Sequence, residues 1–283
     1  MRIIVTGGNS GVGEATAAAL AAAGHSVLIA CRTIPKAERA AAAMSGDVEV
    51  RHLDLADLAS VRTFADSVES VDVLVNNAGV VGLPLTRTTD GFEAHLGTNH
   101  LGHFALTCLL GDKITDRVIS VASVTYHLGR IDLDDLNWHT RKYSMWPAYE
   151  QSKLATMLFT NELARRGVRA YSSDPGVADS DITRDATGLF HWIGEHVQPH
   201  VAQSAPHAAR ANIEAVTTDL PSGTYLAPRF TAWGKPKATT PRTKACDPAV
   251  ARRLWELSAE LTGCDWTSDR TASGHAETEG GAR

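Results

Sequence analysis

The feature that most constrains how this chain can fold is a regular alternation of short apolar runs with helical segments. The runs are rich in β-branched residues, and most are almost continuously apolar, which is typical of strands that are buried on both faces. The sequence therefore predicts strands at residues 2–6, 26–30, 48–53, 71–76, 116–123, 168–173 and 223–227.

Between these runs the sequence has helical spacing and good helix formers. Pro248 near the start and Gly263 at the end delimit the last of these helices. Strands alternating with helices at this spacing predict βαβ units, and so an α/β fold with a Rossmann-type doubly wound parallel sheet of about seven strands in a three-layer α/β/α arrangement. The expected helices span residues 11–24, 35–44, 58–69, 100–110, 149–166, 204–216 and 247–263.

Length and charge narrow the class of protein. The chain has 283 residues, of which 43% are hydrophobic, and this suits one large domain with a sizeable core. We expect a single domain over residues 1–266 and a disordered polar tail over residues 267–283. The net charge is -5 and the basic residues form no stripe, so nucleic acid is not an expected partner.

The N-terminal segment enters a strand-like run at once, and no apolar run approaches the ~20 residues of a membrane span. We therefore expect a cytoplasmic protein without a membrane span. The four cysteines are scattered without ligand spacing, which fits reduced thiols. His95, His100 and His103 are interpreted as packing or surface residues rather than metal ligands, because no further ligand is evident beside them.

A glycine-rich stretch, VTGGNSGVG, lies between the first expected strand and the first expected helix. Glycine permits a sharp turn and lets backbone approach a pyrophosphate, while the helix N-terminus offers unpaired N–H groups. Alone, such a loop is often only a tight turn, but at the start of a βαβ unit it favours nucleotide binding. The loop predicts a dinucleotide site formed by Gly7, Asn9, Ser10, Gly11, Val12 and Gly13.

The end of the second expected strand indicates which dinucleotide. A ribose-binding acid is expected there, about 20 residues beyond the loop. Instead the sequence reads ACRTIPK, with Arg32 and Thr33 in place and no acid before Glu38. A planar guanidinium fits a 2′-phosphate, so we predict NADP(H) rather than NAD(H). The alternative is that Arg32 is a solvated surface residue.

Several separated motifs resemble those of the short-chain dehydrogenase/reductase family, in the expected order and over roughly residues 2–227. They are TGGNSGVG at 6–13, DL at 54–55, NNAG at 76–79, Asn99, Ser123, Tyr149-x-x-x-Lys153 and Pro175–Gly176. Within the family the chain is most like the retinol dehydrogenase branch. The stretches that carry this likeness are NHLGHFAL, YHLGRIDLDDLN, AYEQSKLATMLFTNELARR and ARRLWELSAELTG.

The chain also departs from this branch in three places. Asp174 stands where histidine is usual, Ser180 stands where threonine is usual, and no N-terminal membrane anchor is expected. These departures leave the chemistry of the family in place but leave retinoid specificity open.

The resemblance implies a role for each motif residue. Tyr149 would be the general acid in reduction and the base in oxidation, and Ser123 would bond the substrate oxygen. Lys153 would bond the nicotinamide ribose, and Asn99 would help hold a water that relays protons to it. The other cofactor contacts implied are Asp54 and Leu55 at the adenine, Asn76, Ala78 and Gly79 in the cleft, and Pro175, Gly176 and Ser180 near the nicotinamide.

The four-residue spacing of Tyr149 and Lys153 also has an electrostatic consequence. A free phenol has a pKa near ~10 and is a poor base at neutral pH. Residues four apart on a helix share a face, so the Lys153 cation is expected to favour the phenolate. The start of a helix over residues 149–166 would act in the same direction. Lowering the phenol pKa by ~3 units requires about 4 kcal/mol.

These observations predict an NADP(H)-dependent oxidoreductase that interconverts a carbonyl (an aldehyde or ketone) and an alcohol. The alternatives are a non-catalytic NADP-binding regulator with this fold and a reductase of a conjugated C=C bond. The complete set of Asn99, Ser123, Tyr149 and Lys153 favours an enzyme. Reduction of a carbonyl and reduction of a conjugated C=C bond can be distinguished only by analysing the product.

The positions of aromatic residues in the sequence indicate the polarity of the substrate. They lie in segment 134–149, with Trp138, Tyr143 and Trp146, and in segment 186–197, with Leu189, Phe190, Trp192 and Ile193. If these segments cap the cleft, the substrate is lipophilic. The equal alternative is that they pack against the sheet. Whether residues 186–204 form a mobile lid stays open.

A homodimer is possible from the sequence. Relatives of this family pair through the helices at 100–112 and 149–166, and the second of these has apolar residues on more than one side. The residues in question are Leu154, Met157, Leu158 and Phe159, which fit either a subunit interface or core packing.

Overall fold

The computed structural model of the protein describes residues 1–176, 203–231 and 233–266. The expected tail at 267–283, Ser180 and the aromatic segment 186–197 lie outside the described residues. Among the helices that the structure describes, none is long and apolar enough to cross a membrane.

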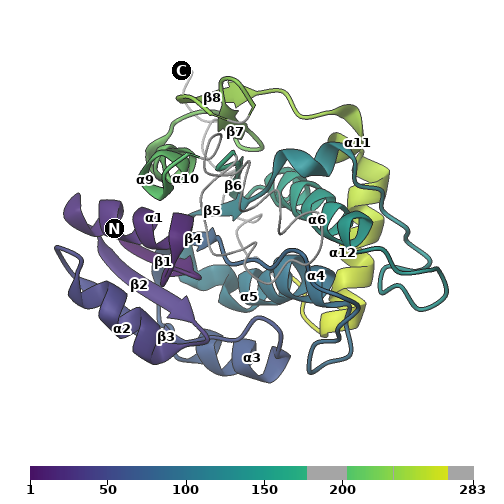
Figure 1. The fold of residues 1–283 in the computed structure, drawn as a ribbon, viewed down its shortest axis with the longest axis horizontal. Coiled ribbons are helices and arrows are strands. Elements are labelled where there is room, and N and C mark those ends of the chain that lie inside the picture. Colours follow the sequence, from purple (N-terminus) through teal and green to yellow (C-terminus); the bar gives the residue numbers. More distant parts are fainter. Residues whose placement is uncertain (177–202, 232, 267–283) are drawn as a thin grey trace, which may run out of the picture.

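The described strands form one eight-stranded sheet in the order β3-β2-β1-β4-β5-β6-β7-β8 (Figure 1). Strands β1 to β7 pair in parallel, and β8 runs antiparallel to β7. The doubly wound parallel sheet predicted from the sequence is therefore confirmed. The strands are β1 Arg2–Thr6, β2 Ser26–Cys31, β3 Val48–His52, β4 Val71–Asn76, β5 Ile114–Val121, β6 Arg169–Ser173, β7 Tyr225–Pro228 and β8 Pro236–Thr239.

Strand β8 is the one strand that the sequence did not predict. It reads PKAT, and its two central residues are exposed. A short edge strand with proline and lysine has no apolar pattern, and these residues protect the sheet edge from pairing with another chain.

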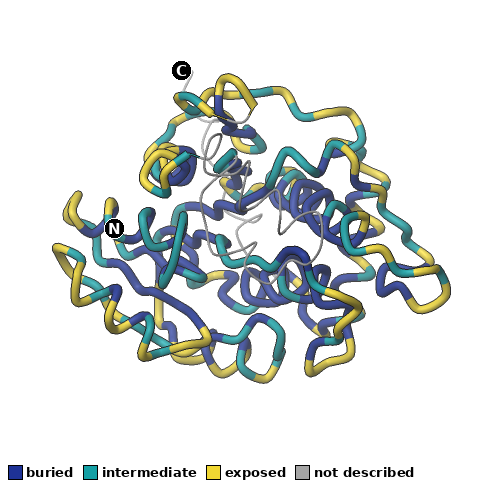
Figure 2. Tube along the Cα trace, viewed as in Figure 1, coloured by how far each residue is buried: buried dark blue, intermediate teal, exposed yellow. Residues whose placement is uncertain are grey.

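Helices cover both faces of the sheet, which completes the predicted three layers. Apolar residues of α1, α2 and α10 pack on one face, and those of α3, α5, α6 and α12 on the other. Figure 2 shows the central strands and the inner sides of these helices as buried. The longer helices are α1 Gly11–Ala22, α2 Ile34–Ala42, α3 Leu58–Asp66, α5 Gly102–Leu110, α6 Met145–Arg165, α10 Arg210–Thr217 and α12 Pro248–Thr262.

Short helical segments complete the chain. They are α4 Ala94–Leu96, the π-turn η1 Gly97–Leu101, the 3-10 turns η2 Gly111–Lys113 and η3 Val124–His127, α9 Ala205–Ala208 and α11 Thr243–Cys246. The first two join α5 into one continuous helical stretch, so this helix begins before the predicted residue 100.

Helix α6 begins at Met145, four residues before the predicted start at Tyr149. Pro147 lies in its first turn, where a missing N–H costs nothing because it would have no partner inside the helix. Tyr149 therefore lies in the second turn. The sequence argument that the positive end of the helix acts directly on this tyrosine is wrong, because that effect falls off within the first turn.

The C-terminal helix α12 packs against α6 and α5 (Figure 1). Trp255 of α12 is stacked on Phe159 at 5.7 Å between ring centroids and lies edge-on to Phe104 at 4.9 Å. The four apolar residues considered for a homodimer interface are at most 4% exposed within this one chain. Core packing therefore accounts for Leu154, Met157, Leu158 and Phe159.

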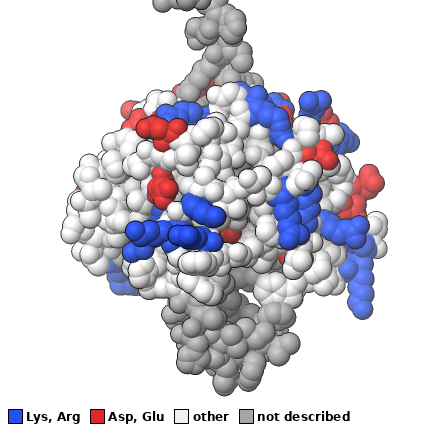
Figure 3. Space-filling model, turned by 90° about the horizontal axis from the view of Figure 1, so that it is seen from above, with Lys and Arg blue, Asp and Glu red and all other residues white. Residues whose placement is uncertain are grey.

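Charged side chains are distributed in small groups over the surface. On the face drawn in Figure 3, the described charged residues form small groups, several of which contain both basic and acidic side chains, with uncharged surface between the groups. Ion pairs such as Arg169–Asp116 at 2.8 Å lie on exposed surface and stabilise the fold little.

Trp255 is expected to be a main contributor to stability on the α12 side of the sheet. We expect Trp255→Ala to lower the free energy of unfolding by about 3–5 kcal/mol, because a large buried ring is replaced by a cavity. Urea denaturation measures the change. Trp233→Ala is the matched control: this ring is 52% exposed, and its loss should cost under about 0.5 kcal/mol. Equal effects of the two changes would contradict the expectation.

Candidate active site

The motif residues gather at the carboxyl ends of β1, β4, β5 and β6. The chain leaves β1 toward β2 on one side, whereas β4 lies on its other side, so the order of strands reverses between β1 and β4. In open α/β sheets a crevice at such a point binds ligands. The motif residues therefore lie where the topology of the sheet predicts a ligand-binding crevice.

The glycine loop after β1 has a conformation that other residues would not tolerate. Gly7 and Gly11 have φ of 65° and 53°, in the left-handed region. A Cβ on Gly13 would overlap the carbonyl oxygen of Gly7 and the side chain of Asn77. The loop is thus compact and held close to the segment that follows β4.

Thr6 joins this loop to the segment after β4. Its hydroxyl oxygen accepts the N–H of Asn77 at 2.8 Å and of Ala78 at 2.9 Å. The Asn77 side chain donates back to the Thr6 carbonyl at 2.8 Å. The two walls of the crevice are therefore tied together by partly buried hydrogen bonds, which restrict the backbone between them.

The residues present fit a nicotinamide dinucleotide. Within the described residues, the Ser10 side chain makes no capping bond to α1, so the first N–H groups of this helix are available to an anion. Across the crevice, a Cβ on Gly79 would lie 3.2 Å from Asn99 Oδ1 and 3.7 Å from Lys153 Nζ. Glycine at these positions leaves room for a ligand to approach the backbone.

The four residues predicted at the adenosine end lie just beyond β2 and β3. Arg32 directly follows β2, and both Arg32 and Thr33 are exposed. Asp54 caps its own turn by accepting the N–H of Ala56 at 2.9 Å. Leu55 is 6% exposed and packs against Gly102 of α5.

The side chain of Asn76 has a different environment from its neighbours. It is 3% exposed, and its Nδ2 donates to the Thr107 hydroxyl of α5 at 3.0 Å. Only the backbone of Asn76 can therefore contribute to the cleft. The side chain holds β4 against α5 instead.

Asn99 lies in the π-turn between α4 and α5. Its Oδ1 accepts the N–H of Val80 at 2.7 Å, and its Nδ2 donates to the Val80 carbonyl at 3.0 Å and to Ser152 Oγ at 2.9 Å. The side chain therefore joins the segment after β4 to helix α6. Short π-helical segments inside helices are frequent at functional sites.

Ser123 lies just beyond β5 and faces Tyr149. Its Oγ accepts the N–H and the hydroxyl of Thr125 at 3.3 and 3.1 Å. The Tyr149 hydroxyl interacts with both side chains. Three hydroxyl groups thus meet at one point, where a carbonyl oxygen of a substrate would have two or more donors.

Burial sets the proton affinity of Tyr149. It raises the pKa of Tyr149 to about 12, and the interactions with Ser123 and Thr125 only partly oppose this rise. From the position of Lys153, the sequence predicted a lowered pKa for the Tyr149 phenol. In the protein without cofactor this prediction is wrong, because the pKa is raised. The physical reason is that desolvation of the phenolate outweighs the favourable interactions of the charged form.

Lys153 is almost fully buried one turn further along α6. Its Nζ donates to the Val121 carbonyl of β5 at 3.0 Å and lies 5.9 Å from the centre of the Tyr149 ring. Burial lowers the pKa of Lys153 to about 8, while the Asp174 carboxylate acts in the opposite direction. The predicted pair therefore meets on one face of α6.

Pro175 and Gly176 continue from β6 into the site. Gly176 has φ of 70°, and its N–H donates to Asp174 Oδ1 at 2.8 Å. The Pro175 carbonyl accepts Gln203 Nε2 at 3.2 Å. This turn is held by the carboxylate that precedes it.

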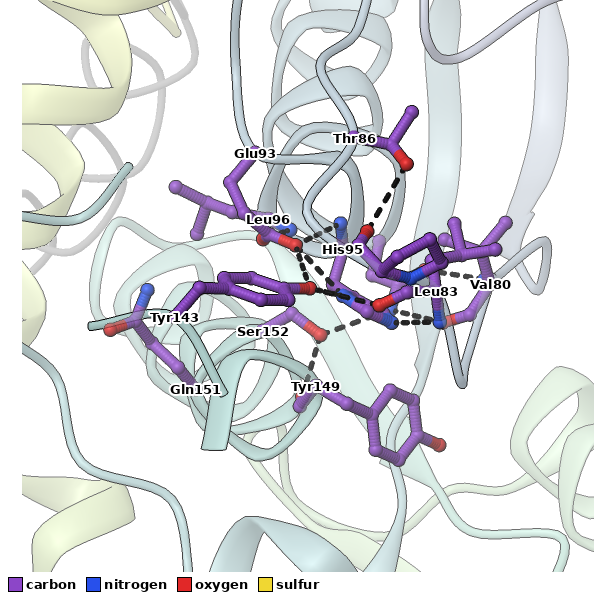
Figure 4. A network of polar contacts seen from close by, with 12 residues as sticks. Val80, Leu83, Thr86, Glu93, His95, Leu96, Tyr143, Tyr149, Gln151 and Ser152 are labelled. Atoms are coloured by element: carbon purple, nitrogen blue, oxygen red, sulfur yellow. Dashed lines mark hydrogen bonds and ion pairs between the residues drawn. The ribbon is translucent and has the colours of Figure 1, made fainter. Parts of the chain in front are cut away.

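A buried network supports the site from behind Tyr149 (Figure 4). Glu93 is fully buried, and its Oε1 accepts His95 Nδ1 at 2.8 Å and the Tyr143 hydroxyl at 3.2 Å. Tyr143 also donates to the Leu83 carbonyl at 3.0 Å. Figure 4 shows the Tyr149 hydroxyl pointing away from this network, so the network positions the ring without contacting its reactive oxygen.

The aromatic residues of segment 134–149 have two different roles. Trp138 is 6% exposed, and the centre of its ring lies 3.6 Å from Cζ of the Arg141 guanidinium. Its side chain therefore packs against other residues of the protein. Trp146 is partly exposed, and its ring lies edge-on to Tyr149 at 6.1 Å. Trp138 therefore fits the packing alternative, whereas a cleft-capping role for Trp146 stays a prediction.

The sequence analysis missed four residues of this environment. Glu93, Thr125 and Tyr225 belong to no motif that spacing could identify, and Asp174 was noted only as a departure from a family pattern. Glu93 does follow a general sequence signal, since acidic residues are favoured at the start of a helical stretch. The three histidines near Asn99 are all buried packing residues, in accord with one of the two roles expected for them.

The fold and the site together define a nicotinamide-dependent oxidoreductase of the α/β type. The short chain dehydrogenase family matches residues 1–188, and the chain belongs to this family. Within it the chain falls in the retinol dehydrogenase branch, so it acts on an alcohol–carbonyl pair.

Individual relatives are similar over almost the whole chain. Retinol dehydrogenase 13 of Homo sapiens is 42% identical over 95% of this chain and 86% of its own length. Retinol dehydrogenase 12 of Homo sapiens is 39% identical over 93% of this chain and 87% of its own length.

Solved structures agree with this assignment. An uncharacterized protein from Mycobacterium Paratuberculosis is 44% identical, with a TM-score of 0.83 over 94% of this chain and 95% of that chain. A short chain dehydrogenase from Burkholderia cenocepacia J2315, solved in complex with NADP, is 26% identical with a TM-score of 0.62 over 79% of this chain and 94% of that chain.

The Glu93 network should give a pH-dependent contribution to stability. Although burial alone would raise the pKa of Glu93, its bonds to His95 and Leu96 lower it overall. A lowered folded pKa means that the stabilisation is complete above the unfolded value of ~4.3 and is lost as pH falls through the folded pKa.

We expect Glu93→Gln to lower the free energy of unfolding by about 2 kcal/mol at pH 7, and by progressively less below pH ~4. Urea denaturation at several pH values measures this. Glu256→Gln, at a side chain that is 52% exposed on α12, is the control and should cost under about 0.5 kcal/mol. A Glu93→Gln effect that is independent of pH would refute the charged role of Glu93.

Proposed function

We propose that this protein is an NADP(H)-dependent oxidoreductase that interconverts a lipophilic aldehyde or ketone and its alcohol, with Tyr149 as general acid and base. The observation that supports this most directly is the meeting of the hydroxyls of Tyr149, Ser123 and Thr125, one helical turn from the buried Lys153. Such a cluster can hold one substrate oxygen and deliver one proton to it.

Each side chain has a distinct part in the proposed reaction. Ser123 donates a hydrogen bond that holds the substrate carbonyl oxygen, and Tyr149 gives that oxygen its proton. Lys153 bonds the ribose of the cofactor, and Asn99 keeps the segment after β4 and helix α6 in register. The nicotinamide, when bound, supplies the hydride.

The proton affinity of Tyr149 favours its use as an acid. With a pKa of about 12, the phenol keeps its proton throughout the neutral range. A general acid must carry its proton before the reaction, whereas a general base must have lost it. We therefore propose carbonyl reduction as the direction that these residues serve best at neutral pH.

Arg32 supports the choice of NADP(H). Its exposed guanidinium follows β2, at the end of the strand where the adenosine ribose is bound in this type of fold. A guanidinium binds phosphate through paired hydrogen bonds and does not compete for a ribose hydroxyl as an acid would.

The proposed substrate is apolar because aromatic surface lies beside the reactive hydroxyl. The ring of Trp146 lies 6.1 Å from that of Tyr149 and is partly exposed. The similarity to retinol dehydrogenases 12 and 13 points to the same class of substrate, a long apolar alcohol or aldehyde.

A panel of aldehydes and ketones tests this proposal together with Tyr149→Phe. We expect the unmodified protein to oxidise NADPH faster with long apolar carbonyls than with small charged ones. Tyr149→Phe should bind NADPH normally but lose about 10²–10⁴-fold in kcat, because the proton donor is removed. NADPH absorbance gives the rates, and chromatography of the product separates an alcohol from a saturated carbonyl.

Three outcomes of this panel would contradict the proposal. They are near-normal turnover in Tyr149→Phe, preference for small charged carbonyls, and a saturated carbonyl as product.

Arg32→Asp tests the cofactor preference. We expect the Kd for NADPH to rise by about 10- to 100-fold, since a charge-assisted pair worth roughly 1.5–3 kcal/mol is lost, while the Kd for NADH does not rise. Quenching of protein fluorescence measures both constants. Arg39→Asp, at an exposed arginine of the neighbouring helix α2, is the control and should change neither preference. If Arg32→Asp prefers the same cofactor as the unmodified protein, by the ratio of the two Kd values, then Arg32 does not determine the preference for NADPH.

A further inference from the structure

A buried carboxylate lies in the site beside the two groups that handle protons. Asp174 directly follows β6 and is 2% exposed. We infer that Asp174 is a positioning residue whose carboxylate keeps the proton on Lys153 and on Tyr149 until the carbonyl is reduced. This inference rests on the proposed function, because it assigns Asp174 a part in the same proton transfer.

The register of the sheet brings Asp174 to this place. Val121 pairs with Ser173 across β5 and β6, and the N–H of Ala122 donates to the Ser173 carbonyl at 2.7 Å. The Val121 carbonyl is the acceptor of Lys153 Nζ. Asp174 is therefore the next residue beyond the strand pair that anchors the lysine, level with Ala122 just beyond β5.

The hydrogen bonds around Asp174 fit an ionised carboxylate. Its Oδ2 accepts the Tyr225 hydroxyl at 2.6 Å, and its Oδ1 accepts the N–H of Gly176 at 2.8 Å. The N–H of Val124 also donates to the carboxyl group. Burial raises the pKa of Asp174, and three donors directed at the carboxyl group oppose that rise, because an ionised carboxylate only accepts hydrogen bonds.

Titratable groups surround this carboxylate on several elements. Lys153 and Tyr149 face it from α6, and Tyr225 faces it from β7 with the ring of Tyr126 at 5.7 Å behind. His95 of α4 lies edge-on to Tyr149 at 6.0 Å between ring centroids, and His103 of α5 interacts electrostatically with Lys153.

Among these groups, Asp174 acts on the proton affinities of the two catalytic ones in one direction. Its charge raises the pKa of Lys153 against the effect of burial, and it adds to the rise that burial gives the pKa of Tyr149. His103 stays neutral over the working range, because burial lowers its pKa to about 4. Asp174 is thus the negative charge that offsets burial of the ammonium.

Asp174→Asn removes this charge and keeps the shape of the side chain. We expect reduction to proceed within about twofold of the normal kcat/KM at pH 6. The alkaline limb of the pH profile should move down by about one unit, so that kcat/KM falls about tenfold at pH 9 relative to the unmodified protein. Asp219→Asn, at a side chain that is 99% exposed, removes the same charge from the surface and should leave the profile unchanged.

A second readout does not depend on turnover. The Lys153 Cε signal, labelled with ¹³C and assigned through Lys153→Met, reports the titration of the ammonium by NMR. We expect its midpoint to move down by about one pH unit in Asp174→Asn and not to move in Asp219→Asn. Should Asp174→Asn fail to fold, Asp174→Ser makes the same change of charge with a smaller side chain and is measured in the same two ways.

The outcomes separate the inference from the proposed function. An unmoved Lys153 midpoint overturns the role of Asp174, whatever the activity. Equal loss of kcat/KM at every pH also overturns it, because that result indicates structural damage. A moved midpoint in a protein that reduces no carbonyl supports the electrostatic role and rejects the proposed function.

Discussion

The buried ammonium of Lys153 is the interaction on which the arrangement of the site depends. A cation with 6% exposure must have polar partners nearby, since an unpaired buried charge is costly. Its bond to the Val121 carbonyl ties helix α6 to the end of β5. That bond acts together with the core packing of α6 to fix which face of the helix meets β5, and the same face carries Tyr149 one turn earlier, opposite Ser123. The position of the reactive hydroxyl thus follows from the need to satisfy the lysine.

The rigidity of the cofactor crevice has a related origin. Polar side chains that come from different elements satisfy the backbone of the segment after β4. Thr6 accepts the N–H groups of Asn77 and Ala78, and Asn99 pairs with both backbone groups of Val80. Because these bonds are partly shielded from water, opening any one of them would leave a poorly solvated polar group without its partner. The loop is therefore held in one conformation before any ligand is bound.

Local properties of the sequence predicted most of the fold and the members of the candidate site. Strands buried on both faces show as continuous apolar runs, and turns that need a left-handed backbone show as glycine. These signals gave seven of the eight strands in the described part of the chain and the order of the motifs. They did not give β8, whose exposed edge position needs no apolar residues, or the true start of α6, where Pro147 resembles a loop residue.

What the sequence by itself determined is the α/β architecture and the set of side chains at the ends of its parallel strands, because period, glycine positions and motif spacing are properties of neighbouring residues. Only the tertiary structure decided the proton affinities of that set. The high pKa of Tyr149 comes from burial, and the position of Asp174 beside Lys153 comes from the pairing of β5 with β6. Burial and strand pairing depend on residues that are far apart in the chain, and no local pattern records them.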